Sequence, residues 1–206
     1  MGEPLITDAP VAPVGDAPGA GRRRRIAPFA VLGVTIVVGV LFAVLAGSKA
    51  QVNTETAASP LIGKAAPSIV DRTIDGEQFD LARMRGSWVV LNFFQTTCRP
   101  CVAEHPELVE FARQQAALPD GAKLISIVWN DNDAAVRKFF ADNGGGWPVV
   151  EDPDGSTAFD YGVAKVPETW VIDPQGRVIV HYVYQIAASE MSARLQQMRD
   201  LATGAG

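Results

Sequence analysis

The chain has 206 residues, of which 48% are hydrophobic and 20% are charged, and its formal net charge is −5. With this negative balance, and with no basic patch in residues 47–206, the composition does not favour nucleic acid as a partner. The only two cysteines are Cys98 and Cys101, so a structural zinc site built from two cysteine pairs is excluded as well.

The N-terminal part of the chain divides into three segments by composition. Residues 22–25 are consecutive arginines, and the stretch that follows, residues 26–46, carries no charge. A helix of that length spans roughly 30 Å, the thickness of the hydrocarbon core of a bilayer. Arginines before the span predict that the N-terminus lies in the cytoplasm. We therefore predict a disordered cytoplasmic tail at 1–25, a single transmembrane anchor at 26–46 and a flexible linker at 47–59.

A cleaved signal peptide is the alternative for the apolar segment. The apolar core of a signal peptide usually has only about 7–15 residues, and residues 48–50 offer a weak small-residue cleavage site. The uncleaved anchor is the preferred interpretation. It predicts a single-pass protein of the cell membrane whose main domain, residues 60–206, is extracytoplasmic.

Residues 60–206 contain the alternating apolar segments of one α/β domain. The expected elements, in chain order, are strands 68–70 and 78–81 of a short hairpin, strand 88–94, helix 102–118, strand 123–129, helix 133–143 capped by Asp133, strand 149–150, a brief helix ending at 161, strands 169–173 and 178–183 of a second hairpin, and helix 189–202. A parallel crossover requires a helix, whereas a hairpin does not. The order predicts a mixed central sheet flanked by helices, with the first hairpin as an N-terminal extension.

Cys98 and Cys101 lie where the buried strand 88–94 gives way to a helical pattern. A cysteine at the N-terminus of a helix is close to unpaired backbone N–H groups and to the positive end of the helix dipole, which favour the thiolate. Arg99 adds a positive charge, and Pro100 suits the first helical turn because no N–H is needed there. The pattern predicts a redox-active dithiol.

The spacing of the two cysteines suits thiol-disulfide exchange. Cys98, at the exposed start of the helix, can attack the disulfide of a partner, and Cys101, one turn further on, can release the partner by closing an intramolecular bond. The alternatives are half of a zinc site, with His105 and His181 as the other candidate ligands, an inert structural disulfide, and a fortuitous pair. We interpret both histidines as surface residues.

Three motifs in the same order resemble a known family. They are residues 92–101 (NFFQTTCRPC) with Glu104 and Pro106 after them, residues 152–155 (DPDG), and residues 161–176 (YGVAKVPETWVIDPQG). With these motifs, residues 60–202 resemble the membrane-anchored thiol-disulfide oxidoreductases of the TlpA/ResA/CcmG type, which have the thioredoxin fold. The resemblance implies an enzyme that reduces protein disulfides without a bound cofactor or metal, because the dithiol itself carries the two electrons.

The resemblance also implies a client-binding surface around the dithiol. Pro167 would be a cis-proline that faces the cysteines and leaves the backbone of Val166 free to pair with an extended client. Thr97, Arg99 and Pro100 are expected to contact the client beside it. Many relatives have a tryptophan at the position of Thr97, so this chain lacks the flat apolar wall that an indole provides beside the first cysteine.

Glu168 follows the proline in a Pro-Glu-Thr sequence that is similar to the cytochrome c maturation branch of the family. This similarity implies apocytochrome c as the client and a membrane thiol-electron transporter as the source of electrons. A partly buried carboxylate near the dithiol could exchange the proton of Cys101 and raise a thiol pKa. We expect Glu168 to take that role, with Glu104 as the alternative.

Two other functions stay open at this point. A disulfide-introducing oxidase is one, because Arg99 would stabilise the reduced form and so make a stronger oxidant. A non-catalytic module that handles a metal or haem is the other. A peroxidase is not favoured, because peroxiredoxins have a threonine three residues before the reactive cysteine, where this chain has Gln95. The tether makes a monomer the expected state.

Overall fold

The computed structural model describes residues 33–42 and 55–204 of the chain. These residues belong to two compact units, Met1–Ala50 and Gln51–Gly206, and each unit is described by itself. The predicted tail at 1–25 lies outside the described residues.

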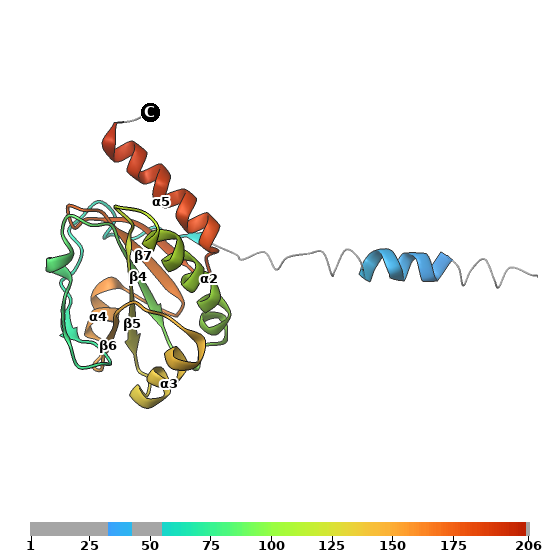
Figure 1. The fold of residues 1–206 in the computed structure, drawn as a ribbon, viewed down its shortest axis with the longest axis horizontal. Coiled ribbons are helices and arrows are strands. Elements are labelled where there is room, and N and C mark those ends of the chain that lie inside the picture. The colour runs from blue at the N-terminus through green and yellow to red at the C-terminus, as the bar shows by residue number, and fades with distance from the viewer. Residues whose placement is uncertain (1–32, 43–54, 205–206) are drawn as a thin grey trace, which may run out of the picture. The chain divides into compact units, whose positions relative to one another are not determined.

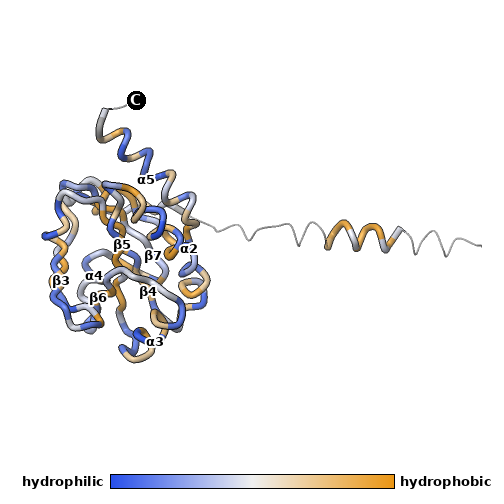
Figure 2. Tube along the Cα trace, in the orientation of Figure 1, coloured by the Kyte–Doolittle hydropathy of each residue, from blue (hydrophilic) through white to orange (hydrophobic). Residues whose placement is uncertain are grey.

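The described part of the first unit is a helix at residues 33–42, inside the predicted span 26–46. Figure 2 shows this helix as a mainly hydrophobic segment. Within the two described ranges, no helix is both long enough and apolar enough to cross a membrane. The remainder of the predicted span, and the first part of the predicted linker, lie outside the described residues.

The second unit is built on a mixed sheet of six strands in the order β1-β8-β7-β4-β5-β6. The three strands β4, β5 and β6 are parallel to one another. On the other side of β4, β7 pairs antiparallel with β4, β8 with β7 and β1 with β8. The mixed central sheet predicted from the element order is therefore confirmed. The bounds of its strands are β1 (Glu55–Thr56), β4 (Val89–Phe94), β5 (Lys123–Trp129), β6 (Val149–Asp152), β7 (Glu168–Ile172) and β8 (Val178–Val183).

Helices cover both faces of the sheet (Figure 1). One face carries α2, α3 and α5, because Leu108 and Leu195 pack in one apolar cluster with Val90, and Val136 packs with Phe94. The other face carries α4, whose Tyr161 packs against Phe93 at 5.6 Å between ring centres. The bounds of the helices are α2 (Arg99–Ala116), α3 (Asp133–Asn143), α4 (Ser156–Tyr161) and α5 (Ala188–Thr203).

The central strand β4 is buried along its whole length. Val89, Leu91 and Phe93 pack on the α4 face, and the residues between them point to the α2 face. A strand covered on both faces is expected to be a continuous apolar run. Asn92 is the polar exception in this run, and it is fully buried.

The N-terminal hairpin has the predicted form. Its strands are β2 (Val70–Arg72) and β3 (Gln78–Asp80), and a 3₁₀ turn, η1 (Leu81–Met84), follows. The side chain of Asp80 accepts a hydrogen bond from the Ala82 backbone N–H and so caps this turn.

Several bounds differ from the expectation by a few residues, and two of the differences involve a strand or a helix cap that was not predicted. The sheet begins before residue 60, because the short strand β1 inside the predicted linker pairs with β8. Helix α3 is capped by Asn132 and not by Asp133, because Asn132 has the extended backbone of a cap and its side chain accepts from the Ala135 N–H. Asp133 takes a place in the first turn, where a carboxylate suits the helix dipole.

Candidate active site

Cys98 and Cys101 form a disulfide at the start of α2, with 5.2 Å between their Cα atoms. Cys98 is the N-cap of the helix, and its Sγ accepts a hydrogen bond of 3.2 Å from the Cys101 backbone N–H. Pro100 lies in the first turn, as predicted. Cys98 is half-buried, whereas Cys101 is completely buried. Cys98 is therefore the more accessible of the two cysteines, and Cys101 lies behind it.

The surface around Cys98 consists of the residues expected to contact a client. Thr97, Arg99 and Pro100 are all exposed. The side-chain amide of Gln185, from the segment before α5, donates to the Pro100 carbonyl oxygen at 2.9 Å. The structure thus brings these three residues together at the rim of the disulfide.

The loop that leads from β4 to the cysteines is held by Asp131. Its carboxylate accepts from the Thr96 backbone N–H and, at 2.9 Å, from the Thr96 hydroxyl. The Gln95 side chain donates to the Trp129 carbonyl oxygen at 3.0 Å. Asp131 was not predicted from the sequence, because it follows β5 and only the parallel pairing of β4 with β5 brings it to this loop.

Val166 and Pro167 face the disulfide from a segment far along the chain. The peptide bond between them is cis, which confirms the expectation drawn from the resemblance. The carbonyl oxygen of Val166 lies 3.4 Å from Cys98 Sγ. The Pro167 carbonyl oxygen accepts from the Tyr184 backbone N–H, which fastens this segment to the end of β8.

Glu104 lies one turn after Cys101 on the buried side of α2, with 1% of its surface exposed. One carboxyl oxygen accepts from the Ile186 backbone N–H at 2.9 Å, and the other accepts from the Asn92 side-chain amide at 3.1 Å. Burial raises the pKa of Glu104 to about 8, while these two hydrogen bonds act in the opposite direction. The side chain is therefore mostly protonated at pH 7 and can exchange a proton near neutral pH.

Glu168 is also buried, but its side chain lies on the other face of the sheet. The side chain of the next residue, Thr169, accepts from Asn92 on the α2 face, and successive residues of a strand point to opposite faces. One Glu168 carboxyl oxygen accepts from the backbone N–H groups of Ala164 and Lys165. The position of Glu168 separates it from Cys101 and connects it to the segment that carries Pro167.

His181 completes the surroundings of Glu168. Its Nε2 lies 2.7 Å from the second carboxyl oxygen of Glu168, and its ring stacks on Trp170 with 3.7 Å between centres. The interpretation of His181 as a surface residue is wrong, because the side chain faces the α4 side of the sheet and is buried there.

His105 is buried as well, so its interpretation as a surface residue is also wrong. Its Nε2 lies 2.8 Å from the Gly144 carbonyl oxygen, and the rings around it are those of Phe94, Phe139, Phe140 and Trp147. Burial lowers the pKa of His105. Among the described residues, no three or more His, Cys, Asp or Glu side chains are grouped to hold a metal ion.

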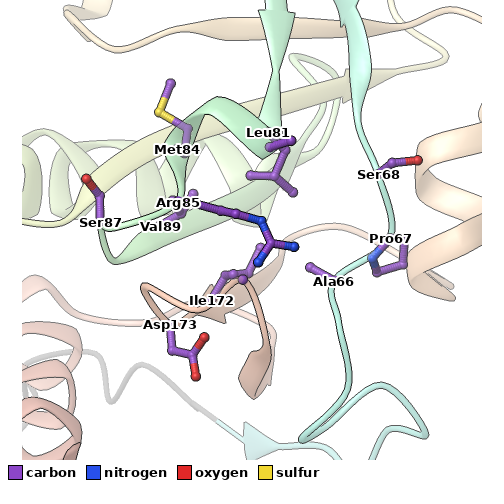
Figure 3. Close-up of a pocket in the computed structure, with 12 residues that line it drawn as sticks. Ala66, Pro67, Ser68, Leu81, Met84, Arg85, Ser87, Val89, Ile172 and Asp173 are labelled. Carbon is purple, nitrogen blue, oxygen red and sulfur yellow. The ribbon is translucent and has the colours of Figure 1, made fainter.

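A small pocket of about 120 Å³ lies at the opposite end of the sheet from the disulfide. Val89 at the start of β4 and Ile172 at the end of β7 line it, together with Leu81. Figure 3 shows the Arg85 side chain extending among the other residues that line it. The dithiol follows the other end of β4, so this pocket is separate from the site.

An accessible cysteine, a buried second cysteine one turn behind it and a cis-proline facing both define a thiol-disulfide oxidoreductase of the thioredoxin-like fold. Residues 62–181 match the AhpC/TSA family. The chain belongs to this family.

Relatives and solved structures agree with this assignment. A "Thiol:disulfide interchange protein DsbE homolog" of Paracoccus denitrificans is 31% identical over 175 residues, which cover 82% of this chain and 92% of the relative. The "Thiol-disulfide oxidoreductase ResA" of Bacillus thuringiensis is 28% identical over 66% of this chain and 78% of its own length. The structure of a thiol:disulfide interchange protein of Chlorobium tepidum, 24% identical, covers 68% of this chain and 98% of that chain with a TM-score of 0.60, which shows the shared fold.

Proposed function

We propose that this oxidoreductase works outside the cytoplasm, tethered by residues 26–46, and that it reduces disulfides in client proteins. The observation that best supports thiol-disulfide exchange is the pairing of a reachable Cys98 with a buried Cys101, which lies one turn from a carboxyl group whose pKa is raised to about 8. Such an arrangement can supply and remove the proton that Cys101 must lose when it becomes a nucleophile.

The reaction transfers two electrons from the dithiol to the client. The Cys98 thiolate attacks one sulfur of the client disulfide, which breaks the client S–S bond and leaves the other client sulfur as a thiolate. Ionised Glu104 takes the proton of Cys101, and the Cys101 thiolate attacks Cys98 Sγ and breaks the mixed disulfide. Glu104 returns its proton to a departing client sulfur and the second proton comes from solvent. The enzyme ends with the Cys98–Cys101 bond.

We assign the proton exchange to Glu104 in preference to Glu168. Glu104 shares helix α2 and one face of the sheet with Cys101, whereas Glu168 lies on the other face. Glu168 instead holds the backbone of Ala164 and Lys165. By doing so, it positions the segment that brings the Val166 carbonyl to Cys98.

The direction of electron flow can be tested by the reduction potential of the Cys98/Cys101 couple. The full chain in detergent is equilibrated with thiol/disulfide buffers and the free thiols are trapped and counted. A value of about −250 mV or lower, close to thioredoxin, is expected for a reductant. A value near about −120 mV would contradict the proposal and favour the oxidase. The absence of a reversible couple would leave only a binding module.

The proposed client is apocytochrome c, supplied with electrons through a membrane thiol transporter. The sequence similarity of Pro167-Glu168-Thr169 to the cytochrome c maturation branch supports it. In Cys101→Ser the second cysteine cannot release the client, so a mixed disulfide through Cys98 should accumulate when oxidised apocytochrome c is added. Gel electrophoresis without reductant detects it. The matched control is the double variant Cys98→Ser/Cys101→Ser, and equal yields of adduct from the two would refute the client.

A further inference from the structure

Asn92 occupies an unusual position for a polar side chain. Asn92 lies within the apolar strand β4 and is fully buried. Its side chain is on the face of the sheet that α2 covers. Its side-chain nitrogen donates two hydrogen bonds, one of 3.1 Å to Glu104 and one of 3.0 Å to the Thr169 hydroxyl. A buried amide costs free energy unless its groups are paired, so its presence here calls for a role.

The pairing of Asn92 is incomplete in one respect. Its side-chain oxygen, Oδ1, is buried and has no hydrogen-bond partner. The side-chain nitrogen, by contrast, donates to Glu104 and Thr169, and each of these side chains can act either as a donor or as an acceptor. A hydroxyl such as that of Thr169 both donates and accepts, and a carboxyl group accepts when ionised but donates when protonated.

The two ends of an amide have nearly the same shape, so a half-turn about χ2 exchanges them. In the orientation of the structure, the nitrogen donates to Glu104, which is the arrangement that an ionised carboxylate requires. In the turned orientation, the Asn92 oxygen would face Glu104, and an ionised carboxylate has no proton to donate to it. The orientation seen in the structure therefore favours the ionised carboxylate.

We propose that Asn92 is a positioning residue that holds the Glu104 carboxyl group beside the dithiol and favours its ionised form by donating a hydrogen bond to it. This inference deepens the proposed function, since it rests on Glu104 as the group that exchanges the Cys101 proton. Asn92 also donates to the hydroxyl of Thr169, which lies on β7 two residues after Pro167. It therefore connects Glu104 on α2 with the strand that follows the cis-proline.

Few other groups can compete with Asn92 for this role. The Ile186 backbone N–H, from the segment before α5, also donates to Glu104. The Thr169 hydroxyl accepts from Asn92, and the titratable side chains of Cys101 and Glu107 lie three residues to either side of Glu104 on α2. Glu107 is turned to the start of α5, where its carboxylate accepts from the Ala188 N–H at 2.8 Å. Burial raises the pKa of Glu104, and Asn92 supplies the side-chain hydrogen bond that opposes this rise.

The test is the titration of Glu104 itself in the oxidised full-length chain, where neither cysteine titrates. The carbonyl stretch of the protonated carboxyl group is followed by infrared spectroscopy against pH, and Glu104→Gln assigns the band. Asn92→Leu, which keeps the volume but removes both polar ends, should move the midpoint upward by at least one pH unit, a tenfold change in proton affinity. Asn92→Ser serves as a second variant if the leucine is not tolerated, and the same direction is expected.

Ser126→Ala is the matched control. Ser126 is the neighbour of Asn92 on β5, it is equally buried, and its hydroxyl accepts from Trp147 and not from Glu104. This variant should leave the midpoint of Glu104 unchanged. An unchanged midpoint in both Asn92 variants, with an intact disulfide and a native circular dichroism spectrum, would overturn the inference.

The role of Asn92 and the proton exchange by Glu104 can be refuted independently of each other. If Glu104→Gln does not alter client reduction while Asn92→Leu moves the Glu104 midpoint, the proton exchange is wrong and the role of Asn92 stands. If both are correct, Asn92→Leu shifts the pH profile of client reduction in the native background. In the Glu104→Gln background the same substitution then produces no further shift.

Discussion

At the scale of single residues, the buried side chains of Glu104 and Glu168 have different surroundings because they lie on opposite faces of the sheet. Glu168 is next to Pro167 in sequence, which made it the first choice for the proton of Cys101, but its side chain points away from α2. Glu104 and His105 lie three and four residues after Cys101, and Leu108 follows at the next turn. This helical spacing marks the buried face of α2. It is the signal that could have identified both Glu104 and His105 as buried.

The first prediction concerns Glu104→Gln. If Glu104 exchanges the Cys101 proton, reduction of a client disulfide at pH 7 should slow by roughly 10²-fold or more, the lower range for general acid–base catalysis. The pH profile should also lose its inflection near the Glu104 pKa of about 8. Stopped-flow measurements between pH 6 and pH 9 check both. A profile identical to that of the native chain would remove Glu104 from the mechanism.

The same substitution has a consequence for stability. The folded chain keeps the Glu104 proton up to a pKa of about 8, whereas the unfolded chain releases it near the ordinary value of 4.5. Between these values the folded state binds more protons, so this group lowers the free energy of unfolding as pH rises. Urea unfolding of the oxidised chain at pH 5 and pH 8 should show a smaller loss of stability in Glu104→Gln than in the native chain.

At the scale of elements, the sequence was most informative where a pattern is long or chemically special. The apolar run of β4, the cysteines at the start of α2 and the second hairpin are all as predicted. The strand β1 was not predicted, because two residues in a polar segment carry no periodic pattern and its pairing with β8 uses backbone groups. The cap of α3 was assigned one residue too late, because Asn132 and Asp133 both have the chemistry of a cap.

The contacts between elements were the least predictable part of the site. Asp131 follows β5 and holds the loop before Cys98, and His105 on α2 holds Gly144 after α3. Neither residue belongs to a short motif, and each acts through a partner 35 or more residues away. Local patterns can reveal which elements form. The packing that selects these partners appears only once the sheet order is known.

At the scale of the whole molecule, the segments before β4 protect the sheet. β1 lies along β8, the outer strand that would otherwise be open, and the N-terminal hairpin reaches β6 at the opposite side, where the Ile74 N–H donates to the Val149 carbonyl oxygen. An uncovered outer strand offers free backbone groups for pairing with another chain.

A fragment cut at the boundary that the sequence suggested, residue 60, would lack β1 and expose the backbone of β8. We expect this fragment to self-associate at concentrations at which a fragment beginning at residue 51 stays monomeric, and sedimentation velocity at matched concentrations can compare the two. Identical sedimentation of both fragments would contradict the expectation. If the shorter fragment self-associates as expected, the segment that contains β1 serves a second purpose, because it prevents aggregation through the backbone of β8.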